Sequence, residues 1–119
     1  MYVVSSITTD LIAKRIYYCD SRLDYIETAK YDGSDRQVVV SGVGFFPHPQ
    51  GIATFESLVY WTDWTLMGVM AVSKFKGVNS MTTVYSSKNE SVSSFPMGIS
   101  VYHPLKQIQS RKCGLNQVA

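Results

Sequence analysis

The chain has few of the residues from which metal clusters and disulfide frameworks are built. Its two cysteines, Cys19 and Cys113, lie 94 positions apart in 119 residues. That spacing makes neither a metal-binding cluster nor a set of paired cysteines. The formal net charge is only +2, with 11 Lys and Arg against 9 Asp and Glu. So small an excess does not indicate nucleic acid or a membrane surface as a partner.

Long apolar runs and the familiar catalytic motifs are missing as well. No run reaches the roughly 18 residues needed to span a bilayer. Residues 1–6 lack the basic region followed by an apolar segment that marks a signal peptide. We find no glycine-rich phosphate loop, no zinc-ligand spacing and no nucleophile elbow. The sequence therefore predicts no catalytic residue, no metal and no cofactor.

What the chain does contain is typical of short β-strands. Apolar residues make up 45% and charged residues 17%, which is enough to form a packed core. β-Branched and aromatic residues alternate with clusters of Gly, Pro, Asn, Asp and Ser. We expect residues 46–51 to form a loop, residues 76–79 a turn, and the valine run at 38–40 to be buried on both faces. The predicted strands are 7–10, 16–20, 24–31, 37–41, 52–55, 58–63, 68–75 and 81–85.

The apolar stretch 58–64 contains the most distinctive feature, Tyr60-Trp61-Thr62-Asp63. A weaker copy, Tyr17-Tyr18-Cys19-Asp20, lies 43 positions earlier. Each copy falls on the second of four predicted strands, and four strands in about 43 to 47 residues are typical of a β-propeller blade. The motif strand is apolar on both faces, as expected of a strand between neighbouring blades. Asp20 and Asp63 are predicted to accept hydrogen bonds from backbone N–H groups at the turns.

The motif Tyr60-Trp61-Thr62-Asp63 resembles the signature of the YWTD propellers of the low-density lipoprotein receptor family. Segments 21–27, 32–36, 48–51 and 101–107 are similar to segments of that family in the same order, and residues 113–116 resemble the start of an EGF-like module. The resemblance covers nearly the whole chain and is greatest for the giant endocytic receptors.

This resemblance implies an all-β fold, a partial YWTD β-propeller of about two four-stranded antiparallel blades plus a closing strand. Residues 1–111 would be the C-terminal part of a propeller, with repeats at about 7–46 and 51–95 and a closing segment at 98–107. Residues 112–119 would be the truncated start of an EGF-like module. A six-bladed ring at this period needs roughly 260 residues. We therefore expect the chain to be part of a larger ring, and to aggregate or be partly molten when made alone, because sheet faces would be exposed.

The function implied is that of a non-catalytic ectodomain module of an endocytic lipoprotein-receptor-related receptor, supporting ligand binding and acid-dependent release. Its partners would be protein or lipoprotein ligands of the parent receptor, at the cell surface or in the endosome lumen, with the membrane span outside this chain. One alternative is a ligand-binding propeller of a Wnt co-receptor or basement-membrane protein. Another is a lactonase-like enzyme, which requires a set of metal ligands that the two repeats do not offer. Asp10, Asp20, Asp63 and His103 could be imagined as such a set, but aspartates at similar places in a repeat indicate a structural role.

Four residues are candidate sites under this resemblance. His48 matches the His-Pro of the family and is a pH-switch candidate, since histidines with a pKa near ~6.5 gain charge between the cell surface and the endosome; the alternative is a loop histidine without that role. A second family histidine position falls at Asp24. Asn89 lies in an Asn-Glu-Ser glycosylation sequon. Cys113 is expected to pair inside the EGF-like module, and Cys19 to be a free buried thiol; the alternative is a disulfide between Cys19 and Cys113.

Overall fold

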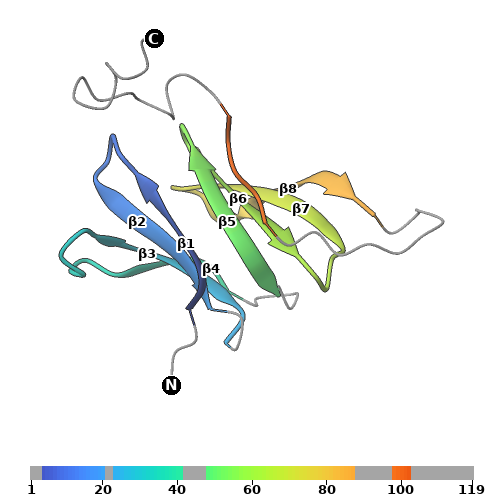
Figure 1. Cartoon of the computed structure of the whole chain (residues 1–119), viewed down its shortest axis with the longest axis horizontal. Helices are drawn as coiled ribbons and strands as arrows, with labels where there is room; N and C mark the ends of the chain where they lie inside the picture. Colours follow the sequence, from blue (N-terminus) through green and yellow to red (C-terminus); the bar gives the residue numbers. More distant parts are fainter. Residues whose placement is uncertain (1–3, 21–22, 42–47, 88–97, 103–119) are drawn as a thin grey trace, which may run out of the picture.

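The computed structural model describes residues 4–20, 23–41, 48–87 and 98–102, and these contain two four-stranded antiparallel sheets (Figure 1). The predicted all-β architecture of two four-stranded antiparallel units is confirmed. Strands adjacent in the sequence are hydrogen-bonded neighbours in each sheet. The first sheet consists of β1 (Val4–Asp10), β2 (Arg15–Asp20), β3 (Tyr25–Lys30) and β4 (Gln37–Val40); the second consists of β5 (Pro49–Phe55), β6 (Leu58–Asp63), β7 (Gly68–Ser73) and β8 (Gly77–Ser86).

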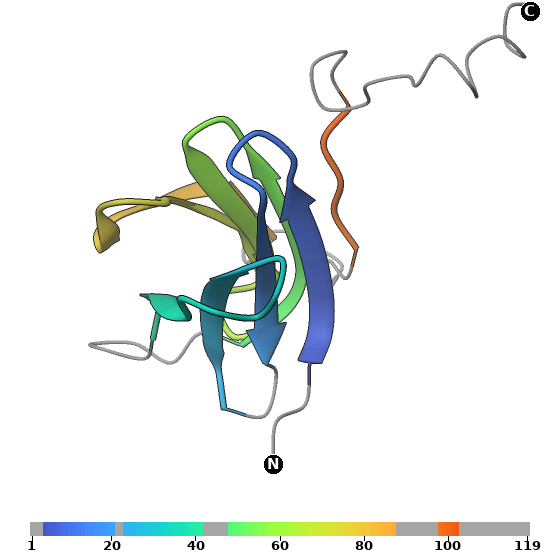
Figure 2. The ribbon, with the colours of Figure 1, turned by 90° about the vertical axis from the view of Figure 1, so that its left-hand side faces the viewer.

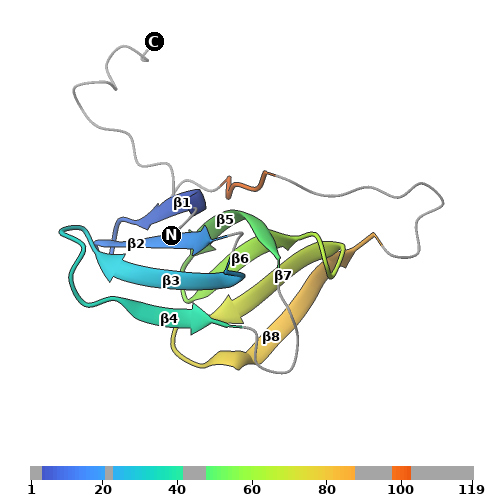
Figure 3. The ribbon, with the colours of Figure 1, turned by 90° about the horizontal axis from the view of Figure 1, so that it is seen from below.

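The two sheets lie side by side (Figure 3). The first strand of each sheet, β1 or β5, is an edge strand of its own sheet and lies where the two sheets meet, and we call it the inner strand. β5 lies beside β1, and Thr54 Oγ1 donates a hydrogen bond to the backbone oxygen of Thr9 over 3.3 Å. The turns that follow β1 and β5 therefore meet at the same end of the molecule (Figure 2). This is the arrangement of neighbouring propeller blades.

The 43-residue repeat is visible in the strand register. Asp20 pairs with Tyr25 in the first sheet, and Asp63 pairs with Gly68 in the second. The motif strand β6 has the predicted bounds, 58–63. Both motif copies therefore occupy the same strand of equivalent sheets.

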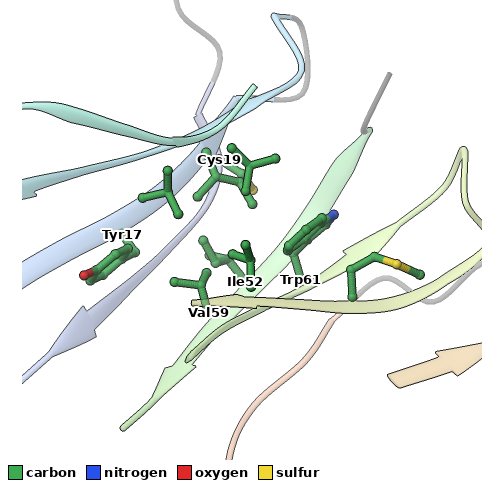
Figure 4. Packing of buried hydrophobic residues seen from close by; sticks show 10 residues of the cluster. Tyr17, Cys19, Ile52, Val59 and Trp61 are labelled. Carbon is green, nitrogen blue, oxygen red and sulfur yellow. The ribbon is translucent and has the colours of Figure 1, made fainter. Parts of the chain in front are cut away.

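The hydrophobic core lies between the sheets, where Tyr17 and Cys19 of the first sheet pack toward Ile52, Val59 and Trp61 of the second (Figure 4). Trp61 and Val59 are fully buried and share this core with Cys19 and Ile26. Full burial of one such apolar side chain contributes about 1.5–3 kcal/mol. On the opposite face of β6, Leu58 and Tyr60 are half-buried. The motif strand thus packs its tryptophan face against the preceding sheet.

Several predicted boundaries were wrong: the strand expected at 7–10 begins at Val4, and the strand expected at 68–75 ends at Ser73. Residues 49–51 belong to β5 and not to a loop, because Pro49 is the first residue of an edge strand, where its missing N–H is tolerated. A register shift between Pro49 and Gly51 accommodates it. The turn expected at 76–79 lies at 74–76, and β8 begins at Gly77, whose φ of 66° suits glycine at the end of a tight turn.

The burial of the valine run and the position of the predicted closing segment also differ from the expectation. Val39 and Val40 are buried, but Val38 is 58% exposed, because it lies near the start of the short outer strand β4. Residues 98–102 lie in neither sheet, and Tyr102 is 96% exposed. The rest of the predicted closing segment, residues 103–107, lies outside the described residues, so that element stays a prediction.

Gly68 starts β7 where the backbone of β8 approaches most closely. A Cβ atom at this position would lie 2.1 Å from the backbone oxygen of Tyr85. We expect Gly68→Ala to lower the free energy of unfolding by about 2–3 kcal/mol, since rigid backbone must shift. Urea denaturation followed by tryptophan fluorescence measures this change. The control is Gly98→Ala, where nothing lies within 4 Å; equal losses in the two variants would contradict the close approach.

Candidate functional site

The site is built on Asp63, the last residue of β6 and fully buried. Its Oδ2 accepts hydrogen bonds from Trp61 Nε1 at 2.9 Å and from the backbone N–H of His48 at 3.0 Å. Its Oδ1 accepts the backbone N–H of Leu66 at 2.8 Å. These bonds satisfy a buried carboxylate, and they are the bonds expected of an acceptor at the end of the motif strand. Asp63 thereby fixes the motif tryptophan, the next turn and the backbone at His48.

Asp20 holds the corresponding turn of the first sheet. Its Oδ1 accepts the backbone N–H of Leu23 at 2.9 Å, and its backbone oxygen accepts the N–H of Asp24 at 2.9 Å. Asp24 has φ of 57°, in the left-handed region that aspartate tolerates better than most residues. The turn therefore presents the Asp24 side chain in a defined direction.

The two aspartate-held segments meet in an interaction between the sheets. Asp24 Oδ1 lies 2.9 Å from Nδ1 of His48, and the two side chains are 35% and 36% exposed. The imidazole lies beside the Trp64 ring, with centroids 6.0 Å apart and planes tilted by 43°. The Trp64 N–H donates to the backbone oxygen of His48 over 3.2 Å. His48 is therefore held by contacts on its side chain and on both of its backbone polar groups.

This geometry constrains the hydrogen bonding of the two ring nitrogens of His48. An ionised carboxylate only accepts hydrogen bonds, so a neutral His48 must carry its proton on Nδ1 to bind Asp24. Nε2 is then an acceptor, and it becomes an N–H donor when the ring is protonated. The same contact would be an ion pair if the ring carried a positive charge.

The other motif residues are structural. Tyr17 is buried in the core, and the Tyr18 hydroxyl donates to Glu27 Oε2 over 2.6 Å. Thr62 Oγ1 accepts the backbone N–H of Gly51 at 2.9 Å. Cys19 is a free, fully buried thiol, and burial raises its pKa despite contact with Ser5.

Several predicted residues are not brought together. Asn89, His103 and Cys113 lie outside the described residues. Asp10 ends β1 and bonds to Lys74, so it does not join Asp20 and Asp63. Within the described ranges, no three His, Cys, Asp or Glu side chains are placed to hold a metal. In the same ranges, no helix has the length and apolar character required to cross a membrane.

Sequence reasoning missed the role of Asp24 as the partner of His48. A local signal was present, because Asp24 follows Asp20 by four positions, as Met67 follows Asp63, and both residues have left-handed φ. The repeat therefore marks position 24 as a turn residue. Only the packing of two sheets shows that its carboxylate reaches the imidazole.

Comparison with known proteins identifies the class. A family model described as low-density lipoprotein receptor repeat class B matches residues 14–56. A chain in the crystal structure of a nidogen/laminin complex superposes with a TM-score of 0.63 at 18% identity, covering 84% of this chain and 36% of that chain. The structural likeness establishes the fold, a partial YWTD propeller. The chain is thus a member of the YWTD-repeat proteins.

The particular family is that of the low-density lipoprotein receptor class B repeat, to which this chain belongs. It is 33% identical over 106 residues to vitellogenin receptor Yl of Drosophila melanogaster, covering 89% of this chain and 5% of that receptor. It is 35% identical over 110 residues to human low-density lipoprotein receptor-related protein 4, covering 92% of this chain and 5% of that protein. The chain thus spans about 5% of the length of these curated relatives.

Proposed function

We propose that this chain is a non-catalytic ectodomain module of an endocytic receptor of the low-density lipoprotein receptor family, supporting ligand binding and acid-dependent release. Its class B repeat and its similarity to a vitellogenin receptor support the receptor assignment. Residues 1–111 would belong to the propeller and residues 112–119 to an EGF-like module. The ligands would be proteins or lipoproteins captured by the whole receptor, at the cell surface or on the lumenal side of endosomes.

The observation that carries the acid-dependent part is the 2.9 Å contact between His48 and Asp24 across the two sheets. Free histidines titrate near pH ~6.5, between the cell surface and the endosome. Protonation adds a positive charge and a new N–H donor at an exposed edge of the interblade loop. A ligand held there through an acceptor-type Nε2, or through its own positive charge, would lose affinity on acidification.

Ligand release from the receptor ectodomain that contains this chain tests the proposal. We expect His48→Gln to slow dissociation at pH ~5.5 by about fivefold or more, because glutamine cannot be protonated in this range. His48→Arg, which is permanently charged, should weaken binding at pH ~7.5. His48 titration, followed by NMR in the Asp24→Asn variant, serves as the control for the pairing. Release from His48→Gln at the wild-type rate would contradict the switch.

Two positions outside the described residues carry further proposals. Asn89 would carry an N-linked glycan, and a mass loss on treatment with peptide N-glycosidase F that is absent in Asn89→Gln would show it. Cys113 would pair inside an EGF-like module, and disulfide mapping by mass spectrometry tests this pairing.

A further inference from the structure

A pocket of about 370 Å³ lies where the two sheets meet, at the end bearing the β1–β2, β5–β6 and β7–β8 turns. In each antiparallel sheet this end is opposite the turn that holds Asp24 or Asp63. Figure 2 shows the β1–β2 and β5–β6 turns side by side there. Arg15 and Tyr17 of β2 line the pocket, together with Ile12, Glu56 and Phe75 from the turns. Both sheets contribute, so the pocket is a product of their packing.

Two large apolar side chains at the pocket are exposed to solvent. Ile12 is 87% exposed and Phe75 is 84% exposed. Neither is needed for the core, yet both are carried on ordered turns. Burial of such side chains by a partner would contribute about 1.5–3 kcal/mol each.

The turns that carry these side chains are fixed by side-chain caps. Asp10 Oδ1 accepts the backbone N–H of Ile12 at 3.2 Å and that of Ala13 at 3.1 Å. Ser73 Oγ accepts the N–H of Phe75 at 3.1 Å and that of Lys76 at 3.2 Å. A surface that is already ordered loses little conformational entropy when a partner binds.

The base of the pocket is polar but neutralised. The Lys74 ammonium lies 2.6 Å from Asp10 Oδ2, donates to the backbone oxygen of Glu56 and sits 5.5 Å from the centre of the Tyr17 ring. Arg15 is paired with Asp35 at 2.8 Å. In these internal pairs each charge is balanced, so a ligand does not need to supply a charge here.

The rim carries the excess charge. Lys14 and Lys76 are exposed on the same turns as Ile12 and Phe75, two positions and one position further along the chain, and within the described part of the chain neither has a salt-bridge partner. Among the residues that line the pocket, only Glu56 has an exposed carboxylate. An anionic segment would therefore be attracted to this rim.

We infer that this pocket binds a segment of a partner protein in which an apolar side chain of the size of Leu or Phe is flanked by carboxylates. The apolar side chain would enter between Ile12 and Phe75, and the carboxylates would approach Lys14 and Lys76. A neighbouring sheet does not fill this role, because sheets pack here through their faces and the turns project from their ends. A flat lipid surface would leave the hollow between the two side chains empty. The site is independent of the proposed function at His48.

Surface plasmon resonance on the receptor ectodomain that contains this chain, captured at low density so that copies cannot associate, tests the inference. The probes are three acetylated peptides: Asp-Asp-Phe-Asp-Asp, the same peptide with Ala at the centre, and Lys-Lys-Phe-Lys-Lys. We expect only the first to bind measurably. Phe75→Ser and Ile12→Ser should each weaken its binding at least about fivefold, which corresponds to losing one apolar contact. Lys76→Glu should weaken it and improve binding of the lysine peptide.

The matched controls are Tyr102→Ser and Val38→Ser, which remove exposed apolar side chains that do not line this pocket and should leave binding unchanged. Equal binding of the Phe and Ala peptides would overturn the inference, as would undiminished binding by Phe75→Ser or no binding of any peptide. Binding to phosphatidylserine vesicles that is lost in Phe75→Ser, with no peptide binding, would assign the surface to lipid instead. Circular dichroism of each variant checks that the fold is retained. The peptide experiment does not involve His48, which does not line this pocket. Its failure would therefore leave the His48 proposal unaffected.

Discussion

Replacing Asp63 with alanine is expected to lower the free energy of unfolding by at least about 4 kcal/mol. The fully buried carboxylate accepts three hydrogen bonds, from Trp61 Nε1 and the backbone N–H groups of His48 and Leu66. A buried donor left unsatisfied costs about 1–3 kcal/mol, and hydrogen bonds to a charged acceptor are at the upper end. Because small domains have about 5–15 kcal/mol in total, this loss would remove a large part of the stability. Urea denaturation measures the loss, with the fluorescence of buried Trp61 as the reporter.

Three further variants separate hydrogen bonding from charge. Asp63→Asn keeps an acceptor oxygen and should lose less than Asp63→Ala. Trp61→Phe removes one donor, so combining it with Asp63→Ala should cost less than the sum of the single changes. Asp32→Ala alters an exposed turn aspartate that bonds only to Ser34 among the described contacts, and it should have a small effect. A loss in Asp63→Ala no larger than that in Asp32→Ala would refute the network.

Lys74→Met is the second substitution with a large expected effect. The Lys74 and Asp10 side chains are only 5% and 11% exposed, and they join the β7–β8 turn of the second sheet to the end of β1 in the first over 2.6 Å. Methionine retains the aliphatic stem but leaves the buried Asp10 carboxylate without its cation. Removing one partner of a buried pair costs about 3–5 kcal/mol. Chemical denaturation monitored by circular dichroism gives the change.

The double variant Asp10→Asn/Lys74→Met is the control for this prediction. Asparagine keeps the oxygen that accepts the N–H groups of Ile12 and Ala13 but carries no charge. We expect it to restore a substantial part of the stability lost in Lys74→Met. Lys76→Met, at an exposed neighbouring lysine, should be nearly neutral. A double variant less stable than Lys74→Met would show that the cost does not come from an unpaired charge.

The Asp10–Lys74 pair also predicts how the contact between the two sheets responds to acid. Burial raises the pKa of Asp10, but the hydrogen bond from Lys74 and those from the backbone of Ala13 and Ile12 outweigh it, and the pKa is lowered. A lowered folded-state pKa gives stability that is present above the unfolded value of about 3.9 and is lost as pH falls through the folded pKa. Endosomal acidity near pH ~5–6 is above that window. The Asp10–Lys74 link between the sheets should therefore survive endosomal acidity.

The sequence predicted the features that arise within one repeat. The motif strand 58–63, its weaker copy and the turn role of Asp20 and Asp63 depend on local spacing and strand period, and the register shows them in both sheets. Pro49 was assigned to a loop because the tolerance of an edge strand for proline depends on its place in the sheet. Val38 was expected to be buried because a run of valines does not reveal which strand is outermost.

The contacts between repeats could not be predicted in the same way. His48 and Asp24 are 24 positions apart, and Lys74 and Asp10 are 64 apart. No periodicity connects these residues, because each pair forms only when the faces of two sheets pack. Nothing in the sequence distinguishes Lys74 from the other lysines, although its ammonium links the two sheets through Asp10. The residues that connect the two blades are thus the ones that a repeat pattern conceals.

The matched sequence unit, residues 14–56, begins just before β2 and ends just after β5. It therefore contains three strands of one sheet and the inner strand of the next. Duplication of such a unit would carry along the whole connection between the two sheets, including the segment from Asp24 to His48. A cut at the unit's borders, by contrast, would separate an inner strand from the sheet that it completes. Gene segments and expression boundaries in such proteins should consequently be chosen by the sheet and not by the sequence repeat.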